Sequence, residues 1–145
     1  MQLARLALLA ALAVGPAQAC TIGVSTPGIL KLSGDGHTLS SANSGGIASV
    51  LAISDLSLLG STTITISDTR LDQTPPGFAA PVTYAATYSA SWLLNGATGS
   101  LASHPSFTVQ PVLNLVVTIT LHNTVTSATG FEQGTYTTKT TVTCS

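Results

Sequence analysis

Charged side chains are scarce in this chain, and Asp, Glu, Lys and Arg together make up 6% of its 145 residues. The basic residues beyond residue 19 are Lys31, Arg70 and Lys139. Because proteins that bind nucleic acid neutralise phosphates with clustered Lys and Arg, this composition argues against nucleic acid as a partner. The acidic residues are equally dispersed, at Asp35, Asp55, Asp68, Asp72 and Glu132. A surface made mainly of Ser, Thr, Gly, Asn and Ala carries little electrostatic repulsion against association.

Long apolar runs are also missing beyond residue 19, so no membrane span is expected there. The first 19 residues follow the order typical of a secretory signal peptide. They carry, in sequence, the cation Arg5, an apolar run from Leu6 to Val14, a Gly15-Pro16 break and the small-residue site Ala17-Gln18-Ala19. We therefore predict a signal peptide over residues 1–19 and a single domain over residues 20–145. The domain is expected to be exported to the periplasm, the cell surface or the extracellular space.

Cysteine occurs only twice, at Cys20 and Cys144. An even cysteine count in an exported protein indicates a disulfide, and this one would tie the first strand to the last. In the alternative, Cys20 is lipidated after cleavage, but Gln18 suits a lipoprotein site poorly and Cys144 would be left as a lone thiol. A disulfide that closes so long a loop is worth roughly 5 kcal/mol in the chain-entropy model, of which about 2 to 4 kcal/mol is usually realised.

Apolar and polar residues alternate with a period of two between Gly, Pro, Asn and Asp turns, which predicts strands. The alternation is clearest in Val112–His122, Ser61–Ser67 and Val82–Trp92, and the last of these collects its aromatic residues on one face that we expect in the core. Further strands are predicted at Cys20–Ser25, Gly28–Leu32, Ile47–Ser54, Ser103–Val109 and Gly134–Cys144. Asn95-Gly96 is the strongest signal for a tight hairpin turn. About seven or eight strands without helices predict an all-β, antiparallel Ig-like sandwich.

Residue parity in the terminal strands places both cysteines on an apolar face. Cys20 shares its face with Ile22 and Val24, and Cys144 shares its face with Val142. If the disulfide lies within one sheet, the two strands are antiparallel neighbours and Ile22 falls opposite Val142. A disulfide that crosses between two sheets is equally consistent with the parity.

Candidate catalytic and metal-binding groups are few. The histidines are His37, His104 and His122, and none lies in a recognised ligand spacing. No Gly-x-Ser-x-Gly nucleophile turn occurs, and the dispersed acids offer few pairs for glycoside hydrolysis. We therefore predict no catalytic residue, no metal and no cofactor, and we expect the protein not to be an enzyme. A small hydrolase with His and Asp from separate loops is the weakest alternative.

The closing segment Gly134-Thr135-Tyr136-Thr137-Thr138-Lys139-Thr140-Thr141-Val142-Thr143-Cys144 resembles the last strand of bacterial fimbrial and spore-coat-U-like secreted domains. In those domains a Gly-x-Tyr entry leads into alternating Thr and Val, and a cysteine stands early in the first strand. The resemblance implies an Ig-like sandwich that builds surface pili or coats, in many cases with a chaperone and a strand donated by a neighbour. Cys20 would leave no N-terminal extension to donate, and the disulfide would join the two ends. The resemblance therefore implies a terminal, coat-like or self-complete member, and it carries no site residue over.

Two functions follow as expectations. The first is a secreted or cell-surface structural or adhesive protein, similar to a pilus or coat subunit, that associates with itself or with a surface assembly. The second is a secreted binding module for a ligand such as carbohydrate, with loops such as Asp68–Ala80 at one end of the sandwich as its site.

Overall fold

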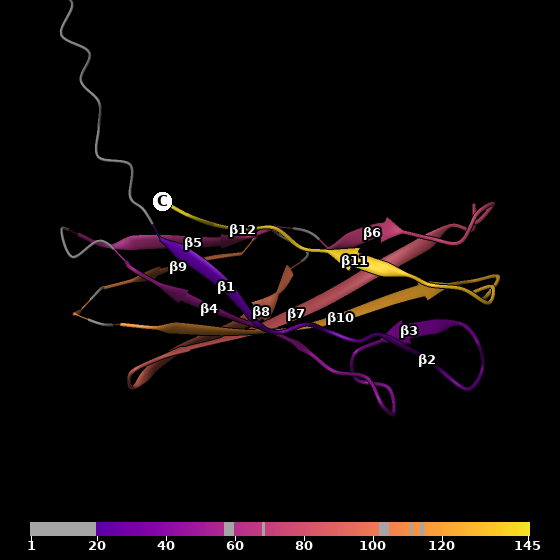
Figure 1. The fold of residues 1–145 in the computed structure, drawn as a ribbon, viewed down its shortest axis with the longest axis horizontal. Coiled ribbons are helices and arrows are strands. Elements are labelled where there is room, and N and C mark those ends of the chain that lie inside the picture. Colours follow the sequence, from indigo (N-terminus) through magenta and orange to yellow (C-terminus); the bar gives the residue numbers. More distant parts are fainter. Residues whose placement is uncertain (1–19, 57–59, 68, 102–104, 111, 114) are drawn as a thin grey trace, which may run out of the picture.

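The structure, a computed structural model, describes residues 20–56, 60–67, 69–101, 105–110, 112–113 and 115–145. None of these residues belongs to an α-helix, and all strand pairs are antiparallel, which confirms the predicted all-β sandwich (Figure 1). The strands are β1 (Thr21–Thr26), β2 (Lys31–Leu32), β3 (Thr38–Ser40), β4 (Ser49–Ser54), β5 (Thr62–Ile66), β6 (Arg70–Gln73), β7 (Val82–Trp92), β8 (Asn95–Ser100), β9 (Ser106–Val109), β10 (Val117–Ser127), β11 (Thr137–Lys139) and β12 (Val142–Cys144). The predicted signal peptide lies outside the described residues. The described part of the chain contains no helix that could cross a membrane.

The first layer is organised around the long strand β10. On one side β10 pairs with β7, from Thr118 opposite Ser91 to Ser127 opposite Val82, and β8 extends the sheet beyond β7. On its other side β10 pairs first with β4 and then with β3. β1 lies outside β4, and β2 lies outside β3. The first layer therefore has β1 and β2 along one edge and β8 along the other.

The second layer is built from two smaller sheets. β5 lies between β12 and β9, and β6 pairs with β11. In the chain β6 follows β5, and β12 follows β11. The two sheets are therefore built from the same two chain segments and lie end to end (Figure 1).

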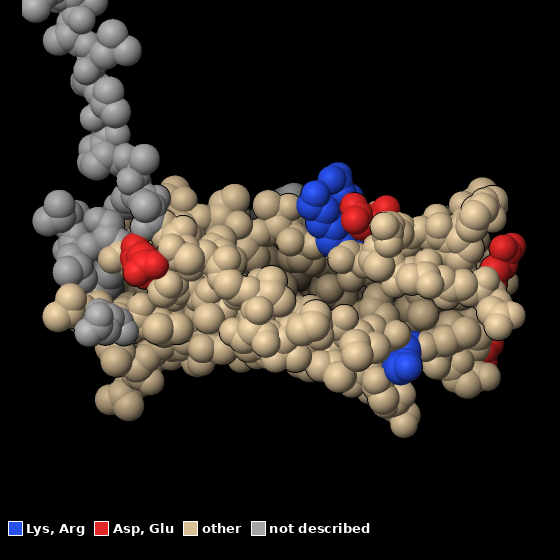
Figure 2. Space-filling model, in the orientation of Figure 1, with Lys and Arg blue, Asp and Glu red and all other residues tan. Residues whose placement is uncertain are grey.

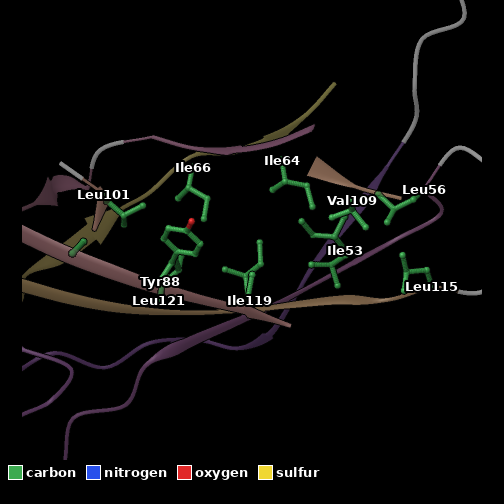
Figure 3. Packing of buried hydrophobic residues seen from close by; sticks show 13 residues of the cluster. Ile53, Leu56, Ile64, Ile66, Tyr88, Leu101, Val109, Leu115, Ile119 and Leu121 are labelled. Carbon is green, nitrogen blue, oxygen red and sulfur yellow. The ribbon is translucent and has the colours of Figure 1, made fainter. Parts of the chain in front are cut away.

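The apolar core fills the space between the layers at the end where β10 begins (Figure 3). Alternate residues of β10 point inward, so that Val117, Ile119 and Leu121 are buried and meet Ile64 and Ile66 of β5. Each such buried aliphatic side chain contributes about 1.5–3 kcal/mol to the free energy of unfolding. This alternation confirms the half-buried strand that the sequence predicts around His122.

Aromatic side chains tie β9 to the first layer. The Phe107 ring stacks on Tyr88 and on Trp92, with centroid distances of 5.8 and 5.4 Å. Both partners lie on β7, on the face predicted to point into the core. Tyr84 from the same face is 43% exposed, because β7 there extends beyond β5 to the narrow sheet of β6, where the Tyr84 hydroxyl accepts a hydrogen bond from the Leu71 backbone N–H at 3.3 Å.

The disulfide joins Cys20 and Cys144, with a Cα–Cα distance of 6.3 Å, and no free cysteine remains. Cys20 precedes β1 in the first layer, and Cys144 ends β12 in the second. Of the two arrangements that parity allows, the structure therefore shows the one in which the bond crosses between layers. Ile22 pairs with Ile53 instead of Val142, and both Ile22 and Val24 are exposed. A disulfide is compatible with an oxidising, exported compartment.

The hairpin turn between β7 and β8 lies two residues before the predicted Asn95-Gly96 turn. Trp92 pairs with Asn95, so the turn residues are Leu93 and Leu94. Leu93 has a φ of 48°, which costs an L-residue roughly 1–2 kcal/mol. The register is set by packing further along the hairpin, since Tyr88 lies opposite Gly99 and its ring occupies the space where a side chain would stand.

Strand boundaries differ from the prediction in several places. The strand predicted at Val112–His122 begins at Val117 and continues to Ser127, and the segment Gly134–Cys144 is divided into β11 and β12. Three strands were not predicted, namely β3, β6 and β8. Each is short or poor in the β-branched residues on which the prediction rests.

We expect the loss of the disulfide to destabilise the fold strongly, because it removes the covalent link between the layers. Replacing Cys20 and Cys144 together by Ser should lower the free energy of unfolding by about 2 to 4 kcal/mol, measured by denaturant titration. The wild-type protein in reducing agent should match the double variant. Equal denaturation midpoints for the wild type and the variant would contradict the prediction.

Candidate binding groove

A groove of about 570 Å³ opens between the two layers, beside the edge strand β1. The disulfide holds the start of β1 against the end of β12, and from there β1 and β11 diverge (Figure 1). Figure 2 shows the resulting hollow near the middle of this face, below a cluster of charged side chains. The groove therefore lies where the edges of the two layers, which the disulfide joins at one end, move apart.

The groove has an apolar wall and a polar wall. Val24 and Ile47 stand on the side of β1 and β4, and Leu51 and Leu121 lie deeper. The opposite wall consists of threonines from β11 and the residue after it: Thr137, Thr138 and Thr140. The groove can therefore receive an uncharged group with an apolar body and some hydrogen-bonding capacity.

Both edges of the groove are irregular. The pairing of β1 with β4 shifts between Val24 and Thr26, and the pairing of β11 with β6 shifts between Thr137 and Thr138. Such bulges redirect side chains and are common next to binding sites. The Thr137 hydroxyl oxygen is buried and has no hydrogen-bond partner in the described part of the chain.

Asn123 forms the polar floor of the groove and links the two layers. Its side-chain oxygen accepts from the Thr69 hydroxyl at 3.2 Å, and its side-chain nitrogen donates to the Thr138 hydroxyl at 3.3 Å. Its backbone N–H donates to the Ser41 hydroxyl at 3.2 Å. Thr69 also lies 2.6 Å from the Thr140 hydroxyl, so a buried network replaces apolar contact here.

Beyond the groove, an aromatic cluster packs between the two layers. The Phe78 and Phe131 rings stack at 5.8 Å, and Tyr136 meets them edge-on at 5.2 and 5.3 Å. The Tyr136 hydroxyl donates to the Glu132 carbonyl at 3.0 Å. Desolvation, with a smaller contribution from the Glu132 charge, raises the pKa of Tyr136 above its usual 10.0. Tyr136 is therefore a neutral hydrogen-bonding group at the end of the groove.

The charged side chains at the rim are dominated by cations. Lys139 and Asp72 line the groove, and Arg70 lies opposite Lys139 in the β11–β6 pair. The described part of the rim therefore has two cations and one acid, although like charges directly opposite each other in a sheet are unfavourable.

The histidines considered as candidates do not line the groove. His37 Nδ1 lies 2.9 Å from the Ser127 carbonyl oxygen, and His122 is exposed on the outer face of β10. His104 and Asp68 lie outside the described residues. No group of three or more His, Cys, Asp or Glu side chains in the described part of the chain is placed to hold a metal ion.

Of the acidic residues that the structure describes, Asp72 is the one that lines the groove. Asp35 supports a turn, where its carboxylate accepts from the Ser33 hydroxyl and from the His37 backbone N–H at 3.1 Å. The Ser33 hydrogen bond is the main cause of a lowered pKa for this exposed carboxyl. Asp55 follows β4 with a φ of 57°, and Glu132 is exposed beside the aromatic cluster. The structure does not bring these acids together with the histidines in the groove.

Comparison with known proteins gives no assignment: no family model matches the chain, and no curated protein or solved structure is significantly similar to it.

Replacing Asn123 should test whether the polar floor supports the fold. Asn123→Ala leaves the Thr69 and Thr138 hydroxyls without this partner, so we expect a loss of about 1–3 kcal/mol in the free energy of unfolding. The control is His122→Ala at the exposed neighbouring position. It should change the free energy of unfolding by less than about 0.5 kcal/mol. Denaturant titration of both variants measures the difference. An Asn123→Ala variant as stable as His122→Ala would show that the network contributes nothing.

Proposed function

We propose that the protein is an exported, non-catalytic structural or adhesive subunit that associates with copies of itself or with a surface assembly. The observation that carries the proposal is the edge strand β1. It pairs with β4 on one side, and its residues Thr21 to Ser25 are exposed. An unpaired edge of this kind is a template for pairing with another chain.

The side chains of β1 do not block such pairing. Its sequence, TIGVST, contains neither a charge nor a proline, which are the residues that usually protect sheet edges. Ile22 is 39% and Val24 is 64% exposed, and Ile29, Leu32 and Ile47 add to the exposed apolar surface of the same region. Contiguous apolar surface is typical of regions that contact other molecules.

The low surface charge and the disulfide also suit a structural or adhesive protein. Seven charged side chains, excluding histidine, are found among the described residues, so copies of the chain repel each other little. The layer-crossing disulfide protects the domain outside the cell, where chaperones and refolding are limited. The resemblance of the closing strand to fimbrial and spore-coat-U-like domains supports an assembly of the pilus or coat type.

Self-association of the purified protein tests this proposal. We expect the oligomer fraction to rise with concentration in sedimentation velocity and the protein to occur in the cell-surface fraction. Gly23→Lys should weaken the association, because it places a charge in the middle of β1, where a Cβ atom would have no neighbour closer than 3.9 Å.

The matched control is Thr87→Lys, which adds the same charge to an exposed position of the interior strand β7. It should leave association unchanged. A protein that stays monomeric at every concentration and is absent from the cell surface would refute the proposal.

A second candidate function is a secreted binding module for a hydroxyl-rich ligand such as carbohydrate. It is favoured by a hollow of about 700 Å³ in the expected loop region, lined by Asp72, Gln73, Thr74, Pro75, Pro76, Gln133, Gly134 and Thr135. Amide and carboxylate side chains of this kind bind sugar hydroxyls. A glycan array should then give a signal that Gln73→Ala weakens and Thr87→Ala does not. An array without any signal would remove this candidate.

A further inference from the structure

The end of the sandwich at which β10 begins carries an exposed aliphatic projection. Leu93 and Leu94 form the β7–β8 turn and are 70% and 102% exposed. Val116, the residue before β10 at the same end, is 48% exposed, and Leu113 is 75% exposed. We call Leu93 and Leu94 the aliphatic tip.

The turn at the tip has the opposite chemistry to an ordinary hairpin turn. Such turns favour Asn, Asp and Gly, because these residues tolerate a positive φ and leave no large apolar side chain in water. Here Leu93 adopts a φ of 48° and Leu94 projects fully into solvent. Packing within the domain does not account for either leucine side chain. Strain together with exposed apolar surface indicates a contact with another molecule.

We propose that the aliphatic tip of one copy inserts into the groove of the next, so that the protein assembles head to tail. This inference rests on the proposed structural function and names the surfaces that such an assembly would use. The groove wall of Val24, Ile47 and Leu51 is apolar, as the tip is. Its volume of about 570 Å³ falls within the roughly 300–1,000 Å³ of sites that enclose small organic ligands, which leaves room for two leucine side chains.

The insertion must occur between molecules. Along β10 the groove floor at Leu121 is five residues from Val116, a separation of about 17 Å at the rise of a β-strand. The β7–β8 turn also lies beyond the end of the sheet, pointing away from its own groove (Figure 1). Because tip and groove are different surfaces, the contact is heterologous and can repeat into a chain of subunits.

Charge agrees with this occupant. Asp55 follows β4 at the same end as the tip, since Ile53 pairs with Val117. Among the described residues, the groove rim carries Arg70 and Lys139 against the acid Asp72. The two surfaces therefore have weakly opposite charge.

Two variants separate the two surfaces. Leu93→Asn with Leu94→Ser removes the tip and keeps a residue that tolerates the positive φ, so the hairpin should remain folded. Ile47→Lys places a charge in the groove wall away from β1, at a position that is 42% exposed. Each variant alone should weaken self-association roughly tenfold or more, measured by sedimentation velocity. The control Thr87→Lys, exposed on the interior strand β7 and outside the groove, should associate like the wild type.

Mixing the two variants is the decisive measurement. The tip variant keeps its groove and the groove variant keeps its tip, so the mixture should form one-to-one dimers that grow no further. Circular dichroism and an intact disulfide confirm that each variant is folded.

Three results would overturn the inference. Dimers of the groove variant alone, with none formed by mixing, would indicate symmetric tip-to-tip contact. Binding of the wild type to phosphatidylcholine vesicles that is lost in the tip variant, without any change in self-association, would assign the tip to lipid. Unchanged association of both variants would reject the tip and groove but leave the proposed function standing, whereas a strictly monomeric wild type would refute both.

Discussion

The bond between Cys20 and Cys144 is the constraint on which the arrangement of the layers depends. It fixes the first strand of one layer to the last strand of the other, 124 residues apart in the chain. Both cysteines are half-buried against the apolar core, so the bond also closes that core on its open side. Because the layers are joined along this side at one end only, β1 and β11 are free to diverge, and the groove is the consequence. The same bond therefore secures the core and shapes the candidate site.

The interior changes character along β10, and this change explains where the groove lies. Its inward residues are Val117, Ile119, Leu121, Asn123, Val125 and Ser127, all of them buried. Up to Leu121 the opposite layer supplies isoleucines, and dispersion and apolar burial hold the layers together. At Asn123 the opposite layer supplies threonines, and hydrogen bonds hold the layers together. The groove lies beside this change, since Leu121 and Asn123 both line it.

The sequence predicted the fold class, the disulfide and the inward face of β10 because each depends on local periodicity or on simple counting. It did not predict the groove, because that depends on how two layers diverge in space. Asn123 could have been found: it holds an inward position by parity with Leu121, and a polar residue there indicates a partner in the opposite layer. Ending the predicted strand at His122 concealed this signal. The turn at Leu93–Leu94 could not be predicted, because the fit of Tyr88 over Gly99 outweighs the local preference for Asn95-Gly96.

Exposed strand edges and low charge create a risk of uncontrolled aggregation as well as an opportunity for ordered assembly. In this fold the bulges on β1 and β11 interrupt both edges of the groove, so a foreign strand can pair regularly with β1 only over the short stretch from Thr21 to Val24. In the proposed assembly the aliphatic tip and the groove then set the direction of association, because they are different surfaces. A contact between two unlike surfaces has a defined direction, whereas pairing between like edges does not. Irregular edges combined with a specific projection would thus give a weakly charged protein a way to assemble in one orientation.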